Sequence, residues 1–191
     1  MKQFIQLRGV MGCGKTSTAR SIIARGDYTV HNLSVGKREY PYTYDAKKNW
    51  LVTGRYDQNV CGGLDGKIKN KDEMKFYLYK IMSELHPELI LFEAVMYGLT
   101  YKFAADIAGM CRQKGYTYTG ILLAPDFEDV LANINKRNGG KPINIPNLSE
   151  KYFRSFTAAE KLKTAGLRVF VENPMKYTPE NLYKIVEEHL A

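Results

Sequence analysis

The chain has 191 residues, of which 45% are hydrophobic and 25% charged, and its formal net charge is +8. This length predicts a single domain, residues 1–191, with a substantial buried core. The sequence has no apolar run near the roughly 20 residues that cross a bilayer, and its first strand begins too early for a signal peptide, so we expect a cytoplasmic protein without membrane contact. Three cysteines without C-x-x-C spacing disfavour a disulfide framework or a zinc site.

The positive charge is unevenly distributed along the chain. Residues 136–168 contain eight Lys/Arg against two Glu, and residues 37–80 contain ten Lys/Arg against six acidic residues. Two interpretations stay open for this pattern. Either these cations lie on solvated helix faces, apart from the few that an ATP site needs, or they bind a partner that is a phosphate-rich polymer.

The first predicted element is a strand over residues 2–8, which runs directly into a Gly-rich motif at residues 9–16. The motif, GVMGCGKT, fits the phosphate-binding P-loop pattern G-x-x-x-x-G-K-[ST], and a helix is expected over residues 15–25. In such a loop the backbone N–H groups face a phosphate at the helix N-terminus. Lys15 then bridges the β- and γ-phosphates of ATP, and the Thr16 hydroxyl ligates Mg²⁺. The predicted nucleotide-binding residues in this loop are Gly9, Gly12, Cys13, Gly14, Lys15, Thr16 and Ser17.

The next part of the chain is rich in aromatic residues. A short strand is expected over residues 28–31, and residues 36–69 are expected to form a small substrate-side insertion. Within it, residues 42–44 and 50–53 read as hairpin strands. The aromatic side chains, Tyr42, Tyr44, Trp50 and Tyr56, have two interpretations. They are half-buried sheet residues, or they stack on an unpaired base.

The rest of the chain alternates between strands and helices. Strands are expected over residues 89–92, 118–123 and 167–171, and helices over 71–85, 101–114, 149–165, after Asp126 and after Thr178. The run at 89–92 is apolar at every position, as in a parallel sheet that is covered on both faces. We therefore predict an α/β fold of three layers, with a five-stranded parallel sheet and helices on both faces. With a P-loop after its first strand, it resembles the nucleoside and nucleotide kinases.

Two further features are candidates for the chemistry. Glu93 lies at the carboxyl end of a predicted strand, where its carboxylate can hold Mg²⁺ through water or accept a proton; the alternative is a capping or salt-bridging glutamate. Residues 136–147 form a polar, Gly-rich segment with Lys136, Arg137 and Lys141. We expect a basic lid loop there, with Arg137 binding ATP and stabilising the transferred charge; the alternative is an exposed basic loop without a catalytic part.

A more specific pattern lies after the predicted hairpin. Gly54-Arg55-Tyr56 is followed by Cys61-Gly62-Gly63-Leu64-Asp65. The chain here resembles the phage P-loop kinases that phosphorylate 5-hydroxymethyluracil bases within DNA, which carry a similar G-[KR]-Y…C-G-G-x-D pattern. The resemblance extends to the strand ending in Phe92-Glu93 and to Arg137-Asn138-Gly139, and it spans most of residues 1–171. Gly66 departs from the Thr or Ser that usually follows the Asp in that family.

This resemblance implies an ATP- and Mg²⁺-dependent kinase of DNA hypermodification that acts in the host cytoplasm. Its partner would be DNA with a modified pyrimidine, extruded from the helix to reach the γ-phosphate. The resemblance implies substrate contacts from Tyr56, Cys61, Gly62, Gly63 and Asp65. Either Asp65 or Glu93 would be the base, and the other would orient the acceptor or the metal. Two alternatives remain, a kinase of free nucleosides, nucleotides or DNA 5′ ends, and a nucleotide-binding regulatory ATPase.

Overall fold

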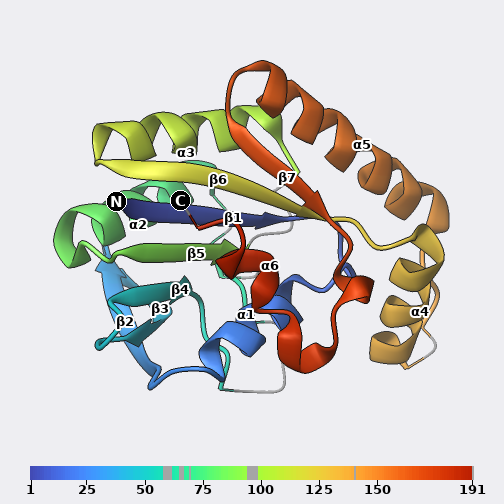
Figure 1. Ribbon diagram of the computed structural model, residues 1–191, viewed down its shortest axis with the longest axis horizontal. Helices are drawn as coiled ribbons and strands as arrows, with labels where there is room; N and C mark the ends of the chain where they lie inside the picture. The colour runs from blue at the N-terminus through green and yellow to red at the C-terminus, as the bar shows by residue number, and fades with distance from the viewer. Residues whose placement is uncertain (58–61, 65–66, 69, 94–98, 140, 191) are drawn as a thin grey trace.

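A seven-stranded sheet forms the centre of the protein in the computed structural model, which describes residues 1–57, 62–64, 67–68, 70–93, 99–139 and 141–190 (Figure 1). The strand order is β2-β3-β4-β5-β1-β6-β7. The strands are β1 (Lys2–Arg8), β2 (Thr29–Val35), β3 (Arg38–Asp45), β4 (Trp50–Thr53), β5 (Leu89–Glu93), β6 (Tyr116–Leu123) and β7 (Arg168–Glu172).

The sheet is mostly parallel, and its strand count corrects the prediction of five. Strands β4, β5, β1, β6 and β7 pair in parallel, whereas β3 is antiparallel to both of its neighbours, β2 and β4. The predicted strand at residues 28–31 is therefore part of an antiparallel edge, and the predicted hairpin belongs to the main sheet. The reason is long-range pairing: Leu51 of β4 lies opposite Ile90 of β5, which local sequence patterns do not encode.

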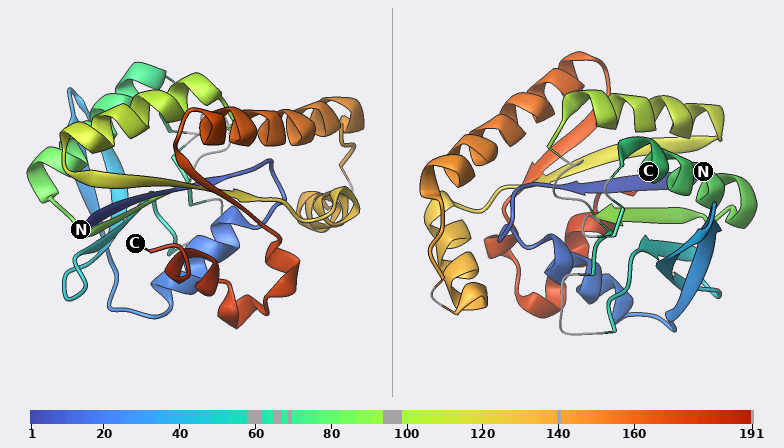
Figure 2. Two further views of the ribbon diagram at one scale, coloured as in Figure 1. Left: turned by 45° about the horizontal axis from the view of Figure 1, so that its top comes forward. Right: turned by 180° about the vertical axis from the view of Figure 1, so that it is seen from behind.

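Helices cover both faces of the sheet, as predicted (Figures 1 and 2). The α-helices are α1 (Lys15–Ile23), α2 (Lys71–Lys80), α3 (Tyr101–Gln113), α4 (Phe127–Asn138), α5 (Ile145–Thr164) and α6 (Lys184–Glu187). A π-helical turn, η1 (Ile81–Leu85), extends α2, and two 3₁₀ turns, η2 (Pro174–Lys176) and η3 (Pro179–Asn181), precede α6. None of the helices in the described part of the chain is long and apolar enough to cross a membrane.

Two hydrophobic cores hold these layers together. On one face of the sheet, α2, α3 and α5 contribute fully or almost fully buried side chains such as Met74, Phe103 and Leu162. On the other face, α1 and α6 contribute Ile22 and Ile185. Burial of one such side chain contributes about 1.5–3 kcal/mol. The two cores therefore fix the sheet, and with it the positions of the carboxyl ends of its strands.

The predicted basic lid at residues 136–147 is helical at both of its ends. Lys136 and Arg137 belong to the last turn of α4, which ends where Gly139 adopts a left-handed conformation with φ of 60°. Helix α5 begins at Ile145 rather than Ser149, because the Asn144 side chain accepts a hydrogen bond from the Asn147 backbone N–H. Only residues 139–144 connect the two helices. Lys136 and Arg137 suggested a loop, but they are exposed residues at the end of an amphipathic helix.

Candidate active site

The P-loop follows the central strand of the sheet and leads into α1. Gly9 and Gly12 have φ of 128° and 85°, values that side chains disfavour. A Cβ at Gly9 would lie 2.7 Å from the Leu123 carbonyl oxygen, and one at Gly12 would lie 2.9 Å from that of Val130. The loop thus needs glycine at both places. The first turn of α1 contains no acidic residue, so its N–H groups and positive helix end remain suited to an anion.

Lys15 lies across this loop and is only 4% exposed. Its Nζ donates to the backbone oxygens of Gly9, at 2.9 Å, and Val10, at 2.7 Å, and it lies 3.4 Å from Cys13 Sγ. These contacts hold the ammonium group inside the loop. Two predicted residues of the motif remain. Gly14 is the N-cap of α1, and Ser17 is exposed on the first turn of that helix.

Glu93 connects the P-loop to the segment after β4. It is 2% exposed and pairs in register with Leu7 of β1, two residues before the loop begins. Its Oε1 accepts a hydrogen bond of 2.6 Å from the Thr16 hydroxyl, and its Oε2 accepts one of 2.8 Å from the Tyr56 hydroxyl. The buried carboxylate is therefore held on both oxygens, beside the start of α1.

Gly62 and Gly63 lie against these same side chains. The Arg55 backbone N–H donates to the Gly62 carbonyl oxygen at 2.9 Å, and a Cβ on Gly62 would collide with the Tyr56 ring. A Cβ on Gly63 would lie 3.3 Å from the backbone oxygen of Glu93. Of the residues that the resemblance singles out, Tyr56 and Gly63 thus lie at the carboxylate, and Gly62 lies against the Tyr56 ring. Cys61 and Asp65 lie outside the described residues.

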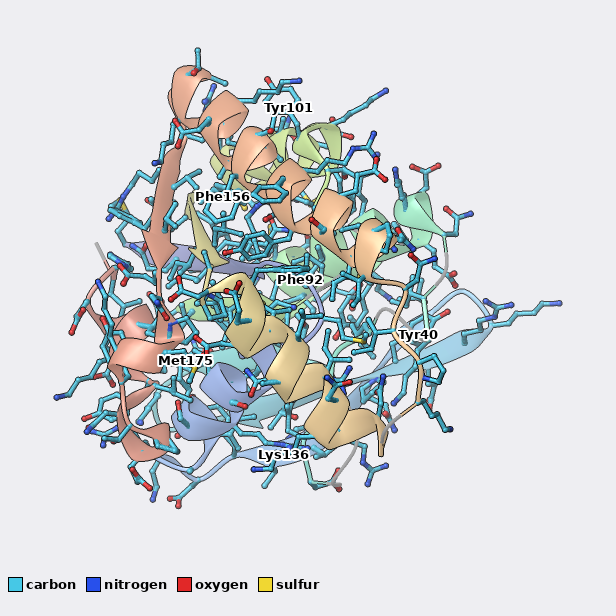
Figure 3. The ribbon with its side chains drawn as sticks, turned by 90° about the vertical axis from the view of Figure 1, so that its right-hand side faces the viewer. Tyr40, Phe92, Tyr101, Lys136, Phe156 and Met175 are labelled. Atoms are coloured by element: carbon cyan, nitrogen blue, oxygen red, sulfur yellow. The ribbon has the colours of Figure 1, made fainter. Side chains whose placement is uncertain are left out.

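Helix α4 packs on the P-loop from the opposite side. Asn133 Nδ2 donates to the Gly12 carbonyl oxygen at 3.0 Å, and Ile134 packs beside the same glycine. Arg137 is exposed one turn beyond Asn133, on the same side of the helix. Figure 3 shows α4 passing in front of α1, with Lys136 towards its far end. Lys141 lies in the connection to α5. Asn133 could not be identified as a site residue from the sequence, because an asparagine in a helix has no distinctive pattern.

Arg8 is the second residue that the sequence analysis missed. It ends β1 directly before Gly9, yet it is 1% exposed. Its Nη1 donates to Gln6 Oε1 at 3.2 Å, while its Nε and Nη2 have no hydrogen-bond partner among the described residues. Burial lowers the pKa of Arg8, an effect that the neighbouring Tyr118 partly opposes. The feature that could have identified Arg8 is its place as an arginine at the end of an otherwise buried strand.

The aromatic residues proposed for base stacking are mostly enclosed. Tyr42 and Tyr56 are 9% and 7% exposed, and Tyr42 stacks on His31 within the sheet. Tyr44 donates its hydroxyl to Asn49, and Trp50 lies under the Lys48 ammonium group. The geometry favours the structural interpretation for Tyr42 and Tyr44.

Solved structures share this arrangement of sheet, loop and helices. The tunicamycin resistance protein of Deinococcus radiodurans matches with a TM-score of 0.57 at 12% identity, over 100% of this chain and 98% of that one. Deoxyadenosine kinase from M. mycoides, with bound dCTP, matches with a TM-score of 0.50 at 10% identity, over 97% of both chains. The chain shares its fold with these two proteins.

A third solved structure has the same fold. A fungal RNA kinase superposes with a TM-score of 0.50 at 11% identity, over 98% of this chain and 44% of the other. By sequence, no protein-family model and no curated protein matches the chain. At these identities the similarity describes the fold alone, so the function has to be inferred from the site itself.

Proposed function

We propose that this protein is an ATP-dependent kinase that transfers the γ-phosphoryl group to the hydroxymethyl group of 5-hydroxymethyluracil bases in DNA. The observation that carries the proposal is the position of Glu93. Its carboxylate accepts hydrogen bonds from Thr16 of the P-loop and from Tyr56, and it lies against Gly63. The donor loop and the segment that resembles the phage DNA kinases therefore converge on one buried carboxylate.

The P-loop fits ATP and Mg²⁺. A Cβ at Gly9 or Gly12 would collide with backbone, and the start of α1 offers N–H groups without an acidic neighbour in its first turn. Lys15 Nζ, now bonded to two loop carbonyls, gains a charged acceptor when a phosphate enters. Thr16 and Glu93 supply adjacent oxygens that suit Mg²⁺. When bound, the ion neutralises charge on the β- and γ-phosphates.

The acceptor side uses a carboxylate and an arginine. In the transfer, the hydroxymethyl oxygen forms a bond to the γ-phosphorus, the bond from that phosphorus to the β–γ bridging oxygen breaks, and the hydroxyl proton passes to a carboxylate. Glu93 or Asp65 takes this proton, and the other orients the acceptor or the metal. Arg137, one turn beyond Asn133 at the P-loop, stabilises the charge of the transferred group.

The experiment is incubation of the protein with γ-labelled ATP and DNA that contains 5-hydroxymethyluracil, followed by digestion and mass spectrometry of the bases. We expect a gain of one phosphate on the modified base and none on thymine in a matched oligonucleotide. Lys15→Ala should abolish the label. Label on free nucleosides or on DNA 5′ ends, with none on the base, would contradict the proposed acceptor. ATP hydrolysis that no acceptor accelerates would indicate a regulatory ATPase instead.

A further inference from the structure

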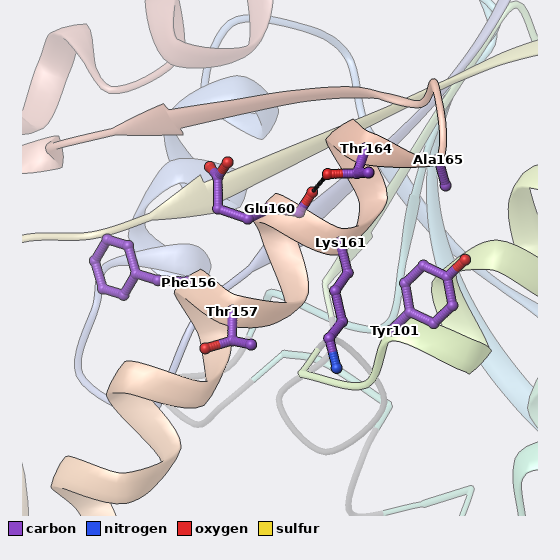
Figure 4. A pocket seen from close by; sticks show the side chains of 7 residues that line it. All are labelled: Tyr101, Phe156, Thr157, Glu160, Lys161, Thr164 and Ala165. Carbon is purple, nitrogen blue, oxygen red and sulfur yellow. Dashed lines mark hydrogen bonds between the residues drawn. The ribbon is translucent and has the colours of Figure 1, made fainter.

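A groove runs between the N-terminal end of α3 and one side of α5. It encloses about 430 Å³, and its charged or aromatic lining comes from Tyr101 on α3 and from Lys151, Arg154 and Lys161 on α5. A wider hollow of about 780 Å³ continues along α5 and shares Tyr101 and Lys161 with the groove. Figure 4 shows these two side chains on either side of the opening between the helices.

The cations of this groove lie on one side of α5. Positions 151, 154 and 161 fall within a narrow arc of the helix, since 3.6 residues complete a turn. Lys151 and Lys161 form no ion pair with any residue in the described part of the chain, and Arg154 pairs with Glu150 at 3.3 Å, where both side chains are exposed. The groove thus presents positive charge that other side chains of the protein leave largely uncompensated.

The groove opens at the same edge of the sheet as the candidate active site. Strand β5 ends at Glu93, and α3 begins at Tyr101 directly after the connection from that strand. The first turn of α3 contains no acidic residue, so its positive end adds to the charge of the α5 cations. Tyr101 is 40% exposed at this place, unlike the enclosed Tyr42 and Tyr56.

We propose that this groove binds the phosphodiester backbone of the DNA strand that carries the acceptor base. The inference rests on the proposed function and specifies where the substrate lies. Ten residues of helix separate Lys151 from Lys161, which is about 15 Å. A B-form DNA strand places a charge about every 3.4 Å along the axis, so the two lysines span about four phosphates. The exposed ring of Tyr101 offers a stacking surface to a base beside that backbone.

The test is binding of fluorescein-labelled single- and double-stranded oligonucleotides by anisotropy, over a series of salt concentrations. Lys151→Gln/Lys161→Gln should weaken binding on the order of tenfold. The slope of log K against log salt is negative, and its magnitude should fall by about 1.4–1.8, because each lost phosphate contact contributes about 0.7–0.9. The matched control is Arg112→Gln/Lys184→Gln, which removes two exposed charges at the far end of α3 and on α6. Its slope should stay at the wild-type value.

Two outcomes separate this inference from the proposed function. If the wild-type protein binds and phosphorylates DNA, and Lys151→Gln/Lys161→Gln keeps the wild-type affinity and salt slope, the groove is not the backbone site although the function stands. If the wild-type protein binds no oligonucleotide but phosphorylates free nucleosides, both are overturned. Affinity for ATP, measured by calorimetry, should be equal in all variants, since the groove does not include the P-loop.

Discussion

The Thr16 hydroxyl donates a hydrogen bond of 2.6 Å to Glu93 Oε1, although 77 residues separate the two in the sequence. Register between parallel strands makes this contact possible, because Glu93 ends β5 beside Leu7 and the P-loop begins two residues further on. The pair places a hydroxyl and a carboxylate side by side at the start of α1.

Substitution of Glu93 separates nucleotide binding from transfer. Glu93→Gln keeps the size of the side chain but removes its charge, and with it the proton acceptor or metal ligand. We expect phosphoryl transfer to fall by about 10²–10⁴-fold, while ATP affinity without Mg²⁺ stays near wild type. Single-turnover transfer of labelled phosphate and calorimetry with and without Mg²⁺ provide the measurements. Transfer within threefold of wild type would exclude Glu93 from both roles.

The Tyr56 hydroxyl can be tested against a similar bond elsewhere. Tyr56→Phe removes its hydrogen bond to Glu93 Oε2 and leaves the ring in place, so the free energy of unfolding should fall by about 1–2 kcal/mol. Tyr40→Phe is the control, because the Tyr40 hydroxyl donates to Glu73 at 2.6 Å away from the P-loop. Both variants should lose stability in urea denaturation, but only Tyr56→Phe should lose activity. Equal activity in the two would mean that Tyr56 acts on stability alone.

The parts of this structure that the sequence predicted are those with local causes. The P-loop, the strand before it and the helix after it follow from residues 2–25, because glycine spacing and hydrophobic periodicity act over a few residues. The apolar run at β5 predicted burial on both faces, which the structure bears out. The same apolar run also predicted that Glu93 lies at the carboxyl end of this strand.

The parts that could not be predicted depend on long-range contacts. Pairing of β4 with β5 places the hairpin in the main sheet, and no local pattern distinguishes this from a separate insertion. The hydrogen bond from Tyr56 to Glu93 joins residues 37 apart. Arg8 ends β1, and its burial, which leaves two of its nitrogen atoms without partners in the described part of the chain, depends on the packing of distant elements.

Gly63 tests how closely the segment after β4 must approach the carboxylate. In Gly63→Ala the added methyl group would lie 3.3 Å from the Glu93 backbone oxygen and 3.6 Å from its carboxyl carbon. We expect displacement of the carboxylate and a loss of transfer of at least tenfold, because small misplacements of a reacting group reduce rates strongly. The measurement is the transfer rate at saturating ATP, with the unfolding free energy of the same variant.

Gly109 supplies the matched glycine substitution. It lies on α3, exposed, and a Cβ there meets no atom within 4 Å. Gly109→Ala should therefore stabilise the protein by about 0.5–1 kcal/mol through helix propensity and leave transfer unchanged. If Gly63→Ala behaved like Gly109→Ala in both measurements, the close approach of Gly63 to Glu93 would have no part in activity.

The Arg55–Asp57 ion pair gives a pH-dependent prediction. Arg55 Nε and Nη2 donate to the two carboxylate oxygens of Asp57 at 2.7 and 2.8 Å, on either side of Tyr56. The hydrogen bonds from Arg55 lower the pKa of Asp57. Because the pKa is lower in the folded protein, the stabilising contribution is complete above the ordinary aspartate pKa and is lost as the pH falls through the lowered value. Both side chains are exposed, so the contribution to stability is small and salt-dependent.

The measurement is a titration of the Asp57 carboxyl carbon by NMR. In Arg55→Gln the midpoint should rise towards the ordinary value of an aspartate, and high salt should move the wild-type midpoint in the same direction. Asp27 is the internal control, since its own pKa is lowered by Lys47 at another place in the fold. A midpoint for Asp57 that Arg55→Gln leaves unchanged would mean that the ion pair does not form in solution.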